Sequence, residues 1–405
     1  MTPPDIGGRK PLAFPEFVAL MALLMALTAL SIDIMLPALP DIARRFALAD
    51  ANAPQLIVPF YLFGLAAGQI FWGPISDRIG RRPPLLAGLA IFTAGSVLAS
   101  FAPSFWWLLT ARLVQGFGAG AARTISIAIV RDAYAGRDMA RVMSLVISTF
   151  IIVPVVAPAF GQALILVGAW SWPFHALGLV GIAAICWVAL RLPETAGPSS
   201  GRTPASYGEA TRAVVGTPIT VAYALAVGLV FGSLVGYVAS AQQIFVDVYG
   251  LGSMFPIAFG AVAVSMAVSS LANAALVRRI GMRRLSHIAL VCYTVSGGVL
   301  ALAALVATPP LWLTLALLSF NFFMFGLITP NLNAIAMHPQ ARFAGMASSL
   351  IGGATTVIGS VCGLLVARQF DGSVLPLATG FMLLGLTAFV LIAVVEGQRG
   401  LFRGE

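Results

Sequence analysis

Three ionisable side chains lie deep inside long apolar stretches: Asp33, Arg112 and Arg123. An ionisable group in the hydrocarbon of a membrane costs about 2.5–3.5 kcal/mol, so each is a functional candidate. Asp33 and Arg112 both lie about six or seven residues, or roughly 10 Å, below the same predicted membrane surface. Burial and a nearby guanidinium act in opposite directions on the proton affinity of an aspartic acid. The pattern predicts that Asp33 and Arg112 interact, directly or through water, and that Asp33 loads and releases protons near neutral pH; a purely structural ion pair is the alternative.

Arg123 follows Arg112 by 11 positions (123 − 112). At about 100° per residue, both arginines project from the same side of a helix, with Arg123 about 16 Å farther along it. Gln115 lies close to that side. Arg123 and Gln115 are therefore predicted to line a cavity, where Arg123 could bind an anionic or electron-rich group. Extension of Arg123 to the membrane surface is the alternative.

The elements that position these residues follow from composition. Hydrophobic residues make up 60% of the chain and charged residues 9%, with a mean hydropathy of +0.97. Soluble proteins are about 25% charged, so the chain is predicted to be an all-α integral membrane protein in a lipid bilayer. Twelve stretches reach the roughly 20 residues that a spanning helix needs: 14–38, 53–73, 83–101, 105–130, 140–167, 170–191, 217–246, 254–277, 285–306, 311–336, 343–367 and 374–395.

The positive charges predict the orientation. With a cytoplasmic N-terminus, all but five of the 23 Lys and Arg residues fall in cytoplasmic segments; the five are Arg44, Arg45, Arg112, Arg123 and Arg368. Such a bias is typical of cytoplasmic loops. We therefore expect a multi-pass membrane protein with both termini cytoplasmic. The net charge of +9 is explained by orientation and does not indicate nucleic-acid binding.

The chain is predicted to consist of two six-helix halves. The longest hydrophilic segment, residues 192–216, indicates a cytoplasmic linker between residues 1–191 and 217–405. The residues Arg78-Ile79-Gly80-Arg81-Arg82 recur 201 positions later (279 − 78) as Arg279-Ile280-Gly281-Met282-Arg283. Both copies lie between the second and third predicted span of their half. The repetition favours two parallel halves, which is one transporter plan.

Three motifs carry a family resemblance. The segment Gly73-Pro74-Ile75-Ser76-Asp77-Arg78-Ile79-Gly80-Arg81-Arg82 resembles the loop signature of the major facilitator superfamily. The run Arg112-Leu113-Val114-Gln115-Gly116 resembles the arginine motif of its drug:proton antiporters, and Asp33 to Pro40 is similar to a segment of the Bcr/CflA branch. Arg131-Asp132 fits the superfamily too. The antiporter motif of the fifth span is only partly kept, as Ala157-Pro158-Ala159-Phe160-Gly161-Gln162.

The resemblance implies a twelve-helix transporter with its substrate site between the halves. It implies proton-coupled export of small amphipathic drugs or toxic compounds by alternating access, with Asp33 and Arg112 coupling the proton. It also implies that the loop is a cytoplasmic gate in which Asp77 meets a helix N-terminus of the second half. The predicted gate residues are Gly73, Asp77, Arg78, Gly80, Arg81, Arg82, Arg131 and Asp132.

Two other functions stay open. The same fold could export a metabolite such as an amino acid derivative, a siderophore or another organic anion. A non-transporting membrane sensor or scaffold would need neither Asp33 nor proton flux. Further cavity candidates are Tyr61, Tyr237, Asn331 and Asn333, for which helix packing or interhelical hydrogen bonding is the alternative. Because the predicted spans of the second half hold no acidic residue, we expect the proton chemistry in the first half.

Enzyme motifs are missing from the sequence. It contains no P-loop and no His/Cys cluster with metal spacing. We therefore expect no enzyme activity, no metal and no cofactor, with the proton motive force as the energy source. The expected partners are a small-molecule substrate and protons, and we expect the protein to work as a monomer.

Overall fold

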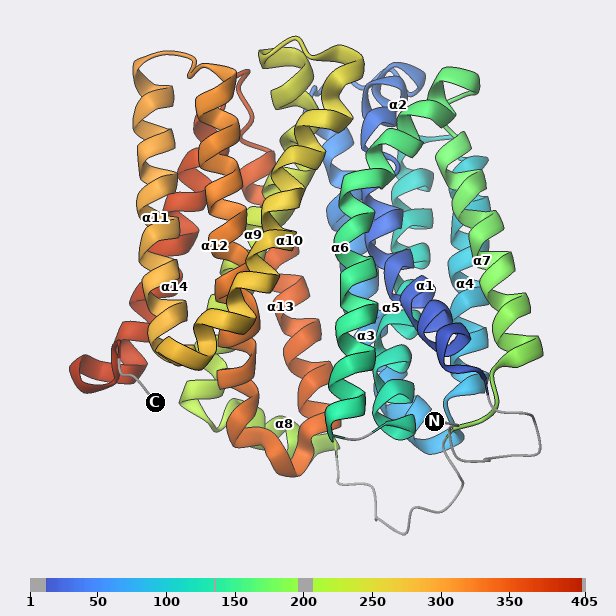
Figure 1. The fold of residues 1–405 in the computed structure, drawn as a ribbon. Coiled ribbons are helices and arrows are strands. Elements are labelled where there is room, and N and C mark those ends of the chain that lie inside the picture. Colours follow the sequence, from blue (N-terminus) through green and yellow to red (C-terminus); the bar gives the residue numbers. More distant parts are fainter. Residues whose placement is uncertain (1–11, 135, 196–206, 403–405) are drawn as a thin grey trace. The chain divides into compact units, whose positions relative to one another are not determined.

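The computed structural model describes residues 12–134, 136–195 and 207–402, and all regular structure within them is helical (Figure 1). The long helices of the first part of the chain are α1 (Phe14–Asp33), α3 (Ile57–Ile79), α4 (Arg82–Ser100), α5 (Phe105–Ala133), α6 (Gly136–Val167) and α7 (Trp172–Arg191). Those of the second part are α9 (Pro218–Gln243), α10 (Phe255–Ile280), α11 (Met282–Val306), α12 (Leu311–Met337), α13 (Ala344–Ala367) and α14 (Leu375–Gly400). Two shorter helices are α2 (Leu39–Arg45) and α8 (Tyr207–Val215).

This architecture confirms the predicted all-α membrane fold. Eleven helical stretches of the described residues are long and apolar enough to cross a membrane. The remaining predicted span, 140–167, corresponds to α6, which is 32 residues long and contributes the apolar stretch Ile152–Val167. Several helices, such as α4 and α7, begin with a proline in the first turn, where the missing N–H has no intrahelical partner to lose.

The contacts divide the chain into two compact units, which are described separately. The first comprises Met1–Phe46 and Phe60–Ser206; the second comprises Ala47–Pro59 and Tyr207–Glu405. The division falls inside the predicted linker 192–216. Of that linker, residues 196–206 lie outside the described part, and α8 occupies residues 207–215. The segment 47–59, expected to belong to the first half, packs with the second unit.

That segment is held by polar contacts within the second unit. The Asn52 side-chain amide donates to the carbonyl oxygen of Phe370 at 2.9 Å, and Asp50 forms an ion pair with Arg368 at 2.8 Å. The Gln243 amide at the end of α9 donates to the carbonyl oxygen of Ala51 at 3.0 Å. These contacts fix residues 50–52 against the ends of α9 and α13.

The first unit packs with very close helix approaches. A methyl group added at Gly116 of α5 would lie 1.9 Å from the carbonyl oxygen of Tyr61 in α3, and one at Gly118 would lie 2.3 Å from the Phe92 amide nitrogen of α4. Only glycine permits such backbone contact. The helices α3, α4 and α5 are therefore joined through backbone contacts, and α5 can place Arg112 in the interior of the unit.

The loop between α3 and α4 is shorter than the sequence indicates. Residues 73–79 continue α3, including Pro74, and only Gly80 and Arg81 lie between the two helices. Gly80 has φ +95°, a left-handed conformation that ends the helix and is accessible to glycine without strain. The sequence placed the end of the span at residue 73, just before the charged residues, but helix α3 continues to Ile79.

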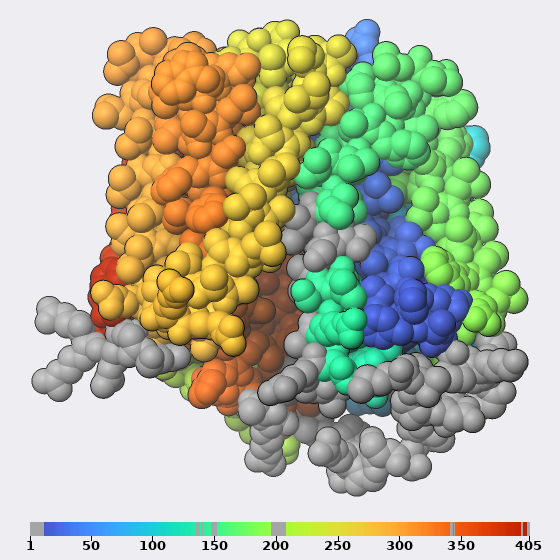
Figure 2. Space-filling model, in the orientation of Figure 1, coloured from blue at the N-terminus to red at the C-terminus, as the bar shows by residue number. Residues whose placement is uncertain are grey.

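Both units expose apolar side chains, as helices in lipid do. In the second unit, α10 (yellow) and α11 (orange) lie at the surface in Figure 2 and carry exposed residues such as Leu271, at 77%, and Val306, at 82%. Large aromatic side chains are exposed at helix ends opposite the α3–α4 and α10–α11 loops: Phe101, Trp106, Trp107 and Trp172 in the first unit and Trp312 in the second. Exposed rings of this kind are typical of the membrane–water interface.

Candidate functional site

Among the residues that the structure describes, Arg112 is the largest fully buried side chain, with no exposed surface. Its guanidinium donates to the Oε1 atom of Gln115 one turn later on α5. It also donates to the carbonyl oxygen of Ser31 on α1 at 3.0 Å. A buried guanidinium needs such oxygen partners, because an unpaired buried charge is very costly. Arg112 thus joins α5 to the end of α1.

Aromatic rings and a second amide complete the surroundings of Arg112. The guanidinium carbon lies 4.4 Å from the centre of the Tyr61 ring and 5.8 Å from that of Phe174. The Gln115 amide donates to the hydroxyl of Ser96 on α4 at 2.7 Å. Cation–π contacts and charge-assisted hydrogen bonds are stronger in a desolvated site. Four helices, α1, α3, α4 and α5, therefore contribute to one buried polar cluster, together with Phe174 of α7.

Asp33 is the last residue of α1 and is 4% exposed. Its helix ends there because Pro37, four residues on, has no N–H to donate to the Asp33 carbonyl. The neighbouring residues Ile34, Met35 and Leu36 are buried, and a methyl group added at Gly161 of α6 would touch the Ile34 carbonyl oxygen. Asp33 is therefore buried among apolar neighbours at the junction of α1 and α6.

The structure brings Asp33 and Arg112 to the same end of α1 but does not pair them directly. Arg112 binds Ser31, two residues before Asp33. Within the described ranges, the Asp33 carboxylate has no hydrogen bond or ion pair. Coupling between the two residues, and their role with protons, remains a prediction. Of the other predicted cavity residues of this unit, Tyr61 and Gln115 are fully buried in the Arg112 cluster, and Arg123 is half-buried farther along α5.

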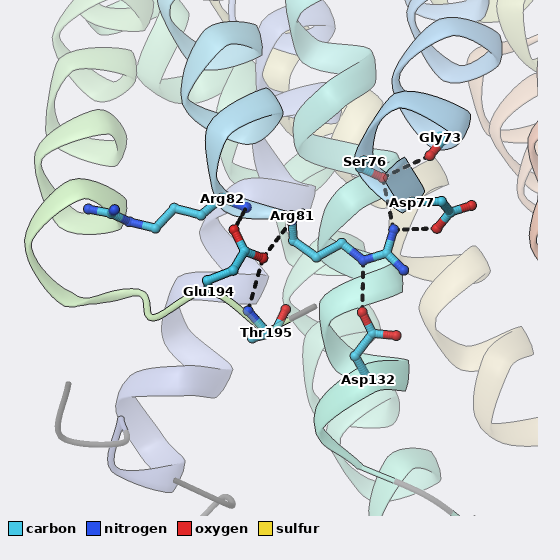
Figure 3. Close-up of polar contacts among 8 residues, drawn as sticks. All are labelled: Gly73, Ser76, Asp77, Arg81, Arg82, Asp132, Glu194 and Thr195. Carbon is cyan, nitrogen blue, oxygen red and sulfur yellow. Dashed lines mark hydrogen bonds and ion pairs between the residues drawn. The ribbon is translucent and has the colours of Figure 1, made fainter. Parts of the chain in front are cut away.

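The second polar cluster surrounds Arg81, at the turn between α3 and α4 (Figure 3). Its guanidinium forms an ion pair with Asp77 and another with Asp132 at 2.7 Å, and it donates to the Ser76 hydroxyl at 2.9 Å. Ser76 in turn donates to the carbonyl oxygen of Gly73 at 2.9 Å. Burial lowers the pKa of Arg81, but Asp132 and Asp77 raise it by more, so its pKa is shifted upward. Arg81 therefore stays charged and ties the ends of α3 and α5 together.

Glu194 is a member of this cluster that the sequence did not reveal. Its carboxylate accepts hydrogen bonds from the backbone N–H groups of Arg81 at 2.7 Å and Arg82 at 3.1 Å (Figure 3). These are orphan donors at the N-terminus of α4, where a negative charge is favoured. The Arg82 side chain reaches the opposite way, to the carbonyl oxygen of Ala189 near the end of α7. Hydrogen bonds from the backbone and from the side chain at the start of α4 thus both reach the end of α7 and the residues that follow it.

The remaining predicted gate residues differ in exposure. Gly73 is buried, whereas Arg78 and Arg131 are exposed. Asp77, predicted to meet a helix of the second half, binds Arg81 of its own unit. Its contact with the second half, like the gating role of the whole set, remains a prediction.

The predicted cavity residues of the second unit lie in different surroundings. Tyr237 is 2% exposed and packs among aromatic rings, with Phe322 at 4.8 Å and Phe259 at 5.4 Å between ring centres. The Asn331 amide donates to Asn273 of α10 at 2.7 Å, which is the interhelical hydrogen bond named as its alternative. Asn333 is exposed.

The expectation that the second half holds no acid inside a span was wrong. Helix α14 continues beyond the predicted end at residue 395 and includes Glu396, whose side chain is 5% exposed. The hydroxyl of Tyr223 donates to Glu396 at 2.8 Å. The apolar run ends at Val395 in the sequence, so the acid looked like a residue outside the helix.

The comparisons with known proteins agree with this architecture. The model of the Major Facilitator Superfamily matches residues 21–364. The chain belongs to this family.

Curated relatives of this transporter family carry further names. The chain is 32% identical to the "Uncharacterized MFS-type transporter YdgK" of Bacillus subtilis, over 89% of each chain. It is 28% identical to the "Bicyclomycin resistance protein homolog" of Haemophilus influenzae, over 94% of each. It is 37% identical to the "Multidrug resistance protein MdtL" of Escherichia coli, over 45% of this chain and 46% of that protein.

Solved structures share the fold at low sequence identity. The xylose transporter XylE from E. coli superposes with a TM-score of 0.74 at 13% identity, covering 94% of this chain and 96% of that one. The human organic anion transporter MFSD10 does so with a TM-score of 0.64 at 17% identity, covering 93% and 99%. At these identities the likeness establishes the fold of a multi-pass membrane transporter and not its substrate.

Proposed function

We propose that this member of the superfamily exports small amphipathic drugs or toxic compounds, driven by protons, through alternating access. The names of the relatives support drug export, since they include a bicyclomycin resistance protein homolog and a multidrug resistance protein. They favour drugs over the metabolite considered as an alternative. The observation that carries the proton coupling is Asp33, a buried acid with no hydrogen bond or ion pair in the described part of the chain.

The contacts of Arg112 are compatible with an Asp33 carboxyl that gains and loses a proton. Arg112 is already bound by Gln115 and by the carbonyl oxygen of Ser31. The C-terminal end of a helix carries a partial negative charge that stabilises a cation. Neutralisation of Asp33 therefore does not leave Arg112 without oxygen partners. The acid can accept a proton while the packing around the arginine persists.

The proposal extends to the setting in which the protein works. We place it in the inner membrane of a bacterium with both termini in the cytoplasm, on the strength of the arginine and lysine distribution. Its partners would be one small molecule and protons, and a single chain would suffice. No cofactor is required, because the proton motive force supplies the energy. Gln115, Arg123, Tyr61, Tyr237, Asn331 and Asn333 remain the candidates for the substrate cavity.

The test is the Asp33→Asn variant, which keeps the size of the side chain and removes its titration. We expect the variant to insert into the membrane like the wild type and, once purified, to have the same unfolding midpoint. In liposomes it should lose accumulation driven by a pH gradient, and purified protein should no longer release protons when drug is added. Asp41→Asn, at a partly exposed acid on α2 that pairs with Arg44, is the matched control.

Two outcomes would contradict the proposal. Retention of proton-driven export with a normal pH profile by Asp33→Asn would exclude Asp33 as the coupling residue. Unchanged drug sensitivity of cells that lack or overproduce the protein, together with no substrate-induced proton release from the wild type, would exclude drug:proton exchange itself.

A further inference from the structure

A further buried cluster, separate from those of Arg112 and Arg81, lies in the second unit, where α9, α11 and α14 contribute titratable side chains. His287 of α11 has no exposed surface. Its Nε2 atom lies 3.0 Å from the hydroxyl of Tyr223 on α9, and that hydroxyl donates to Glu396 of α14 at 2.8 Å. Arg283 Nε lies 3.5 Å from the same Glu396 oxygen. The proposed transport mechanism uses none of these four residues.

The hydrogen bonds identify the protonation state of His287. The backbone N–H of Phe402 points at the Nδ1 atom of His287, with 3.3 Å between the nitrogens. A backbone N–H can only donate, so Nδ1 must be an unprotonated acceptor. The proton of the ring is then on Nε2 and is donated to Tyr223, whose own proton goes to Glu396. The observed arrangement therefore requires a neutral imidazole.

Phe402 belongs to a short segment, residues 397–402, that we call the C-terminal hook. The helical geometry of α14 breaks at Gly397, and the chain returns so that the Phe402 ring packs edge-on against His287, with 5.8 Å between ring centres. The centre of the Phe389 ring lies 6.3 Å from the centre of the Phe402 ring. Phe402 has φ +60°, an unfavourable conformation for a non-glycine residue that persists only when its surroundings hold it. The contact with His287 is part of what holds it.

We propose that His287 is a proton-binding site that anchors the C-terminal hook when neutral and releases it when protonated. A proton on Nδ1 would face the Phe402 N–H, so that two donors would oppose each other and the hydrogen bond would be lost. The titratable and charged groups that act on His287 from the packed helices are Tyr223, Arg283 and Glu396.

The coupling is reciprocal. If protonation of His287 weakens the hook, then docking of the hook must weaken proton binding by the same factor. Histidine is the side chain whose ordinary titration lies nearest to neutral pH. The site would make the position of the hook respond to the pH at this end of the second unit. This inference concerns residues 223–402 alone and does not depend on the identity of any transported compound.

The experiment measures amide deuterium exchange of the C-terminal peptide that contains Phe402, in the purified full-length protein. After correction for the intrinsic pH dependence of exchange, protection should fall about two- to tenfold between about pH 8 and about pH 5.5, the effect of losing one hydrogen bond over the range of histidine titration. In His287→Gln, whose amide can accept from Phe402 and donate to Tyr223 without ever becoming charged, protection should stay constant. His338→Gln, at an exposed histidine, should behave like the wild type.

A second measurement covers the case in which His287→Gln does not fold. The chain has only 3 histidines, so their titrations can be followed by NMR in the wild type and in Phe402→Ala. Removal of the Phe402 ring should loosen the hook and move the His287 titration midpoint to higher pH. Protection that does not change with pH in the wild type, an undiminished pH response in His287→Gln, or an unmoved midpoint in Phe402→Ala would each overturn the proposal.

Discussion

The turn between α3 and α4 and its counterpart between α10 and α11 each contain a glycine with positive φ, but they differ in the charged residues around it. Each has a glycine in the left-handed region, Gly80 at φ +95° and Gly281 at φ +84°. Each is followed within two residues by an arginine that reaches toward the last helix of its unit. Arg82 contacts the carbonyl oxygen of Ala189 in α7, and Arg283 lies beside Glu396 in α14.

The difference lies in the residue after the glycine. In the first unit it is Arg81, with two carboxylates and a serine hydroxyl as partners. In the second it is Met282, which can form none of these contacts. Two carboxylates near the ends of the units, Glu194 and Glu396, also serve different partners: backbone N–H groups in one case and a tyrosine hydroxyl in the other. The glycine supplies the turn in both units, and the contacts of Arg81 with Asp77, Asp132 and Ser76 are an addition that Met282 cannot reproduce at the second turn.

The largest effect should come from making the first turn resemble the second. Arg81→Met leaves Asp77, Asp132 and Ser76 without their shared partner. Because side chains of Asp77 and Asp132 are 39% and 23% exposed, water can replace part of what is lost, and we expect a loss of about 2–3 kcal/mol rather than the full cost of a broken buried pair. The unfolding midpoint in detergent measures it. Arg78→Met, at an exposed neighbour, is the control, and an equal effect of both would refute a special role for Arg81.

A smaller effect should distinguish the two glycines. Alanine at either position must adopt a left-handed conformation, at about 1–2 kcal/mol. At Gly80 the added methyl would also lie 2.8 Å from the carboxyl carbon of Glu194. Gly80→Ala should therefore lower the unfolding midpoint more than Gly281→Ala, and Glu194→Ala should remove part of that excess. Equal midpoints for the two alanine variants would show that the Glu194 contact does not restrict the turn.

The smallest effect on stability should come from Asp77→Asn. This side chain is 39% exposed and Arg81 keeps Asp132, so the expected loss is below about 1 kcal/mol. Transport should nevertheless fall, because the predicted gate needs the charge of Asp77. Arg278→Gln, at the corresponding position of the second turn, should leave transport unchanged. Transport by Asp77→Asn at the wild-type rate would remove the gate hypothesis while leaving the structural cluster intact.

The sequence predicted those features that depend on local composition. Long apolar runs identified the helices, and the repeated Arg-Ile-Gly-x-Arg pattern at 78–82 and 279–283 identified both turns. It could not predict Glu194 as a partner of the α4 N-terminus, since that contact joins residues 113 positions apart (194 − 81). Nor could it predict that the Ser31 carbonyl receives Arg112, because every residue has a carbonyl. Helix α8 was taken for linker because its nine residues are too few for a span, and Glu396 was placed outside α14 because apolarity ends before the helix does.

The exposed aromatic side chains at the helix ends have a consequence for the lipid that surrounds the protein. Phe101, Trp106, Trp107 and Trp172 mark one level on the first unit, and Trp312 stands at the start of α12 in the second. Rings of this type prefer the headgroup layer, so they fix how deep each unit sits. A bilayer that is too thin or too thick would have to deform around them, at a fraction of a kcal/mol for each ångström of mismatch. Acyl-chain length should therefore tune the rate of the reconstituted protein without any change in its sequence.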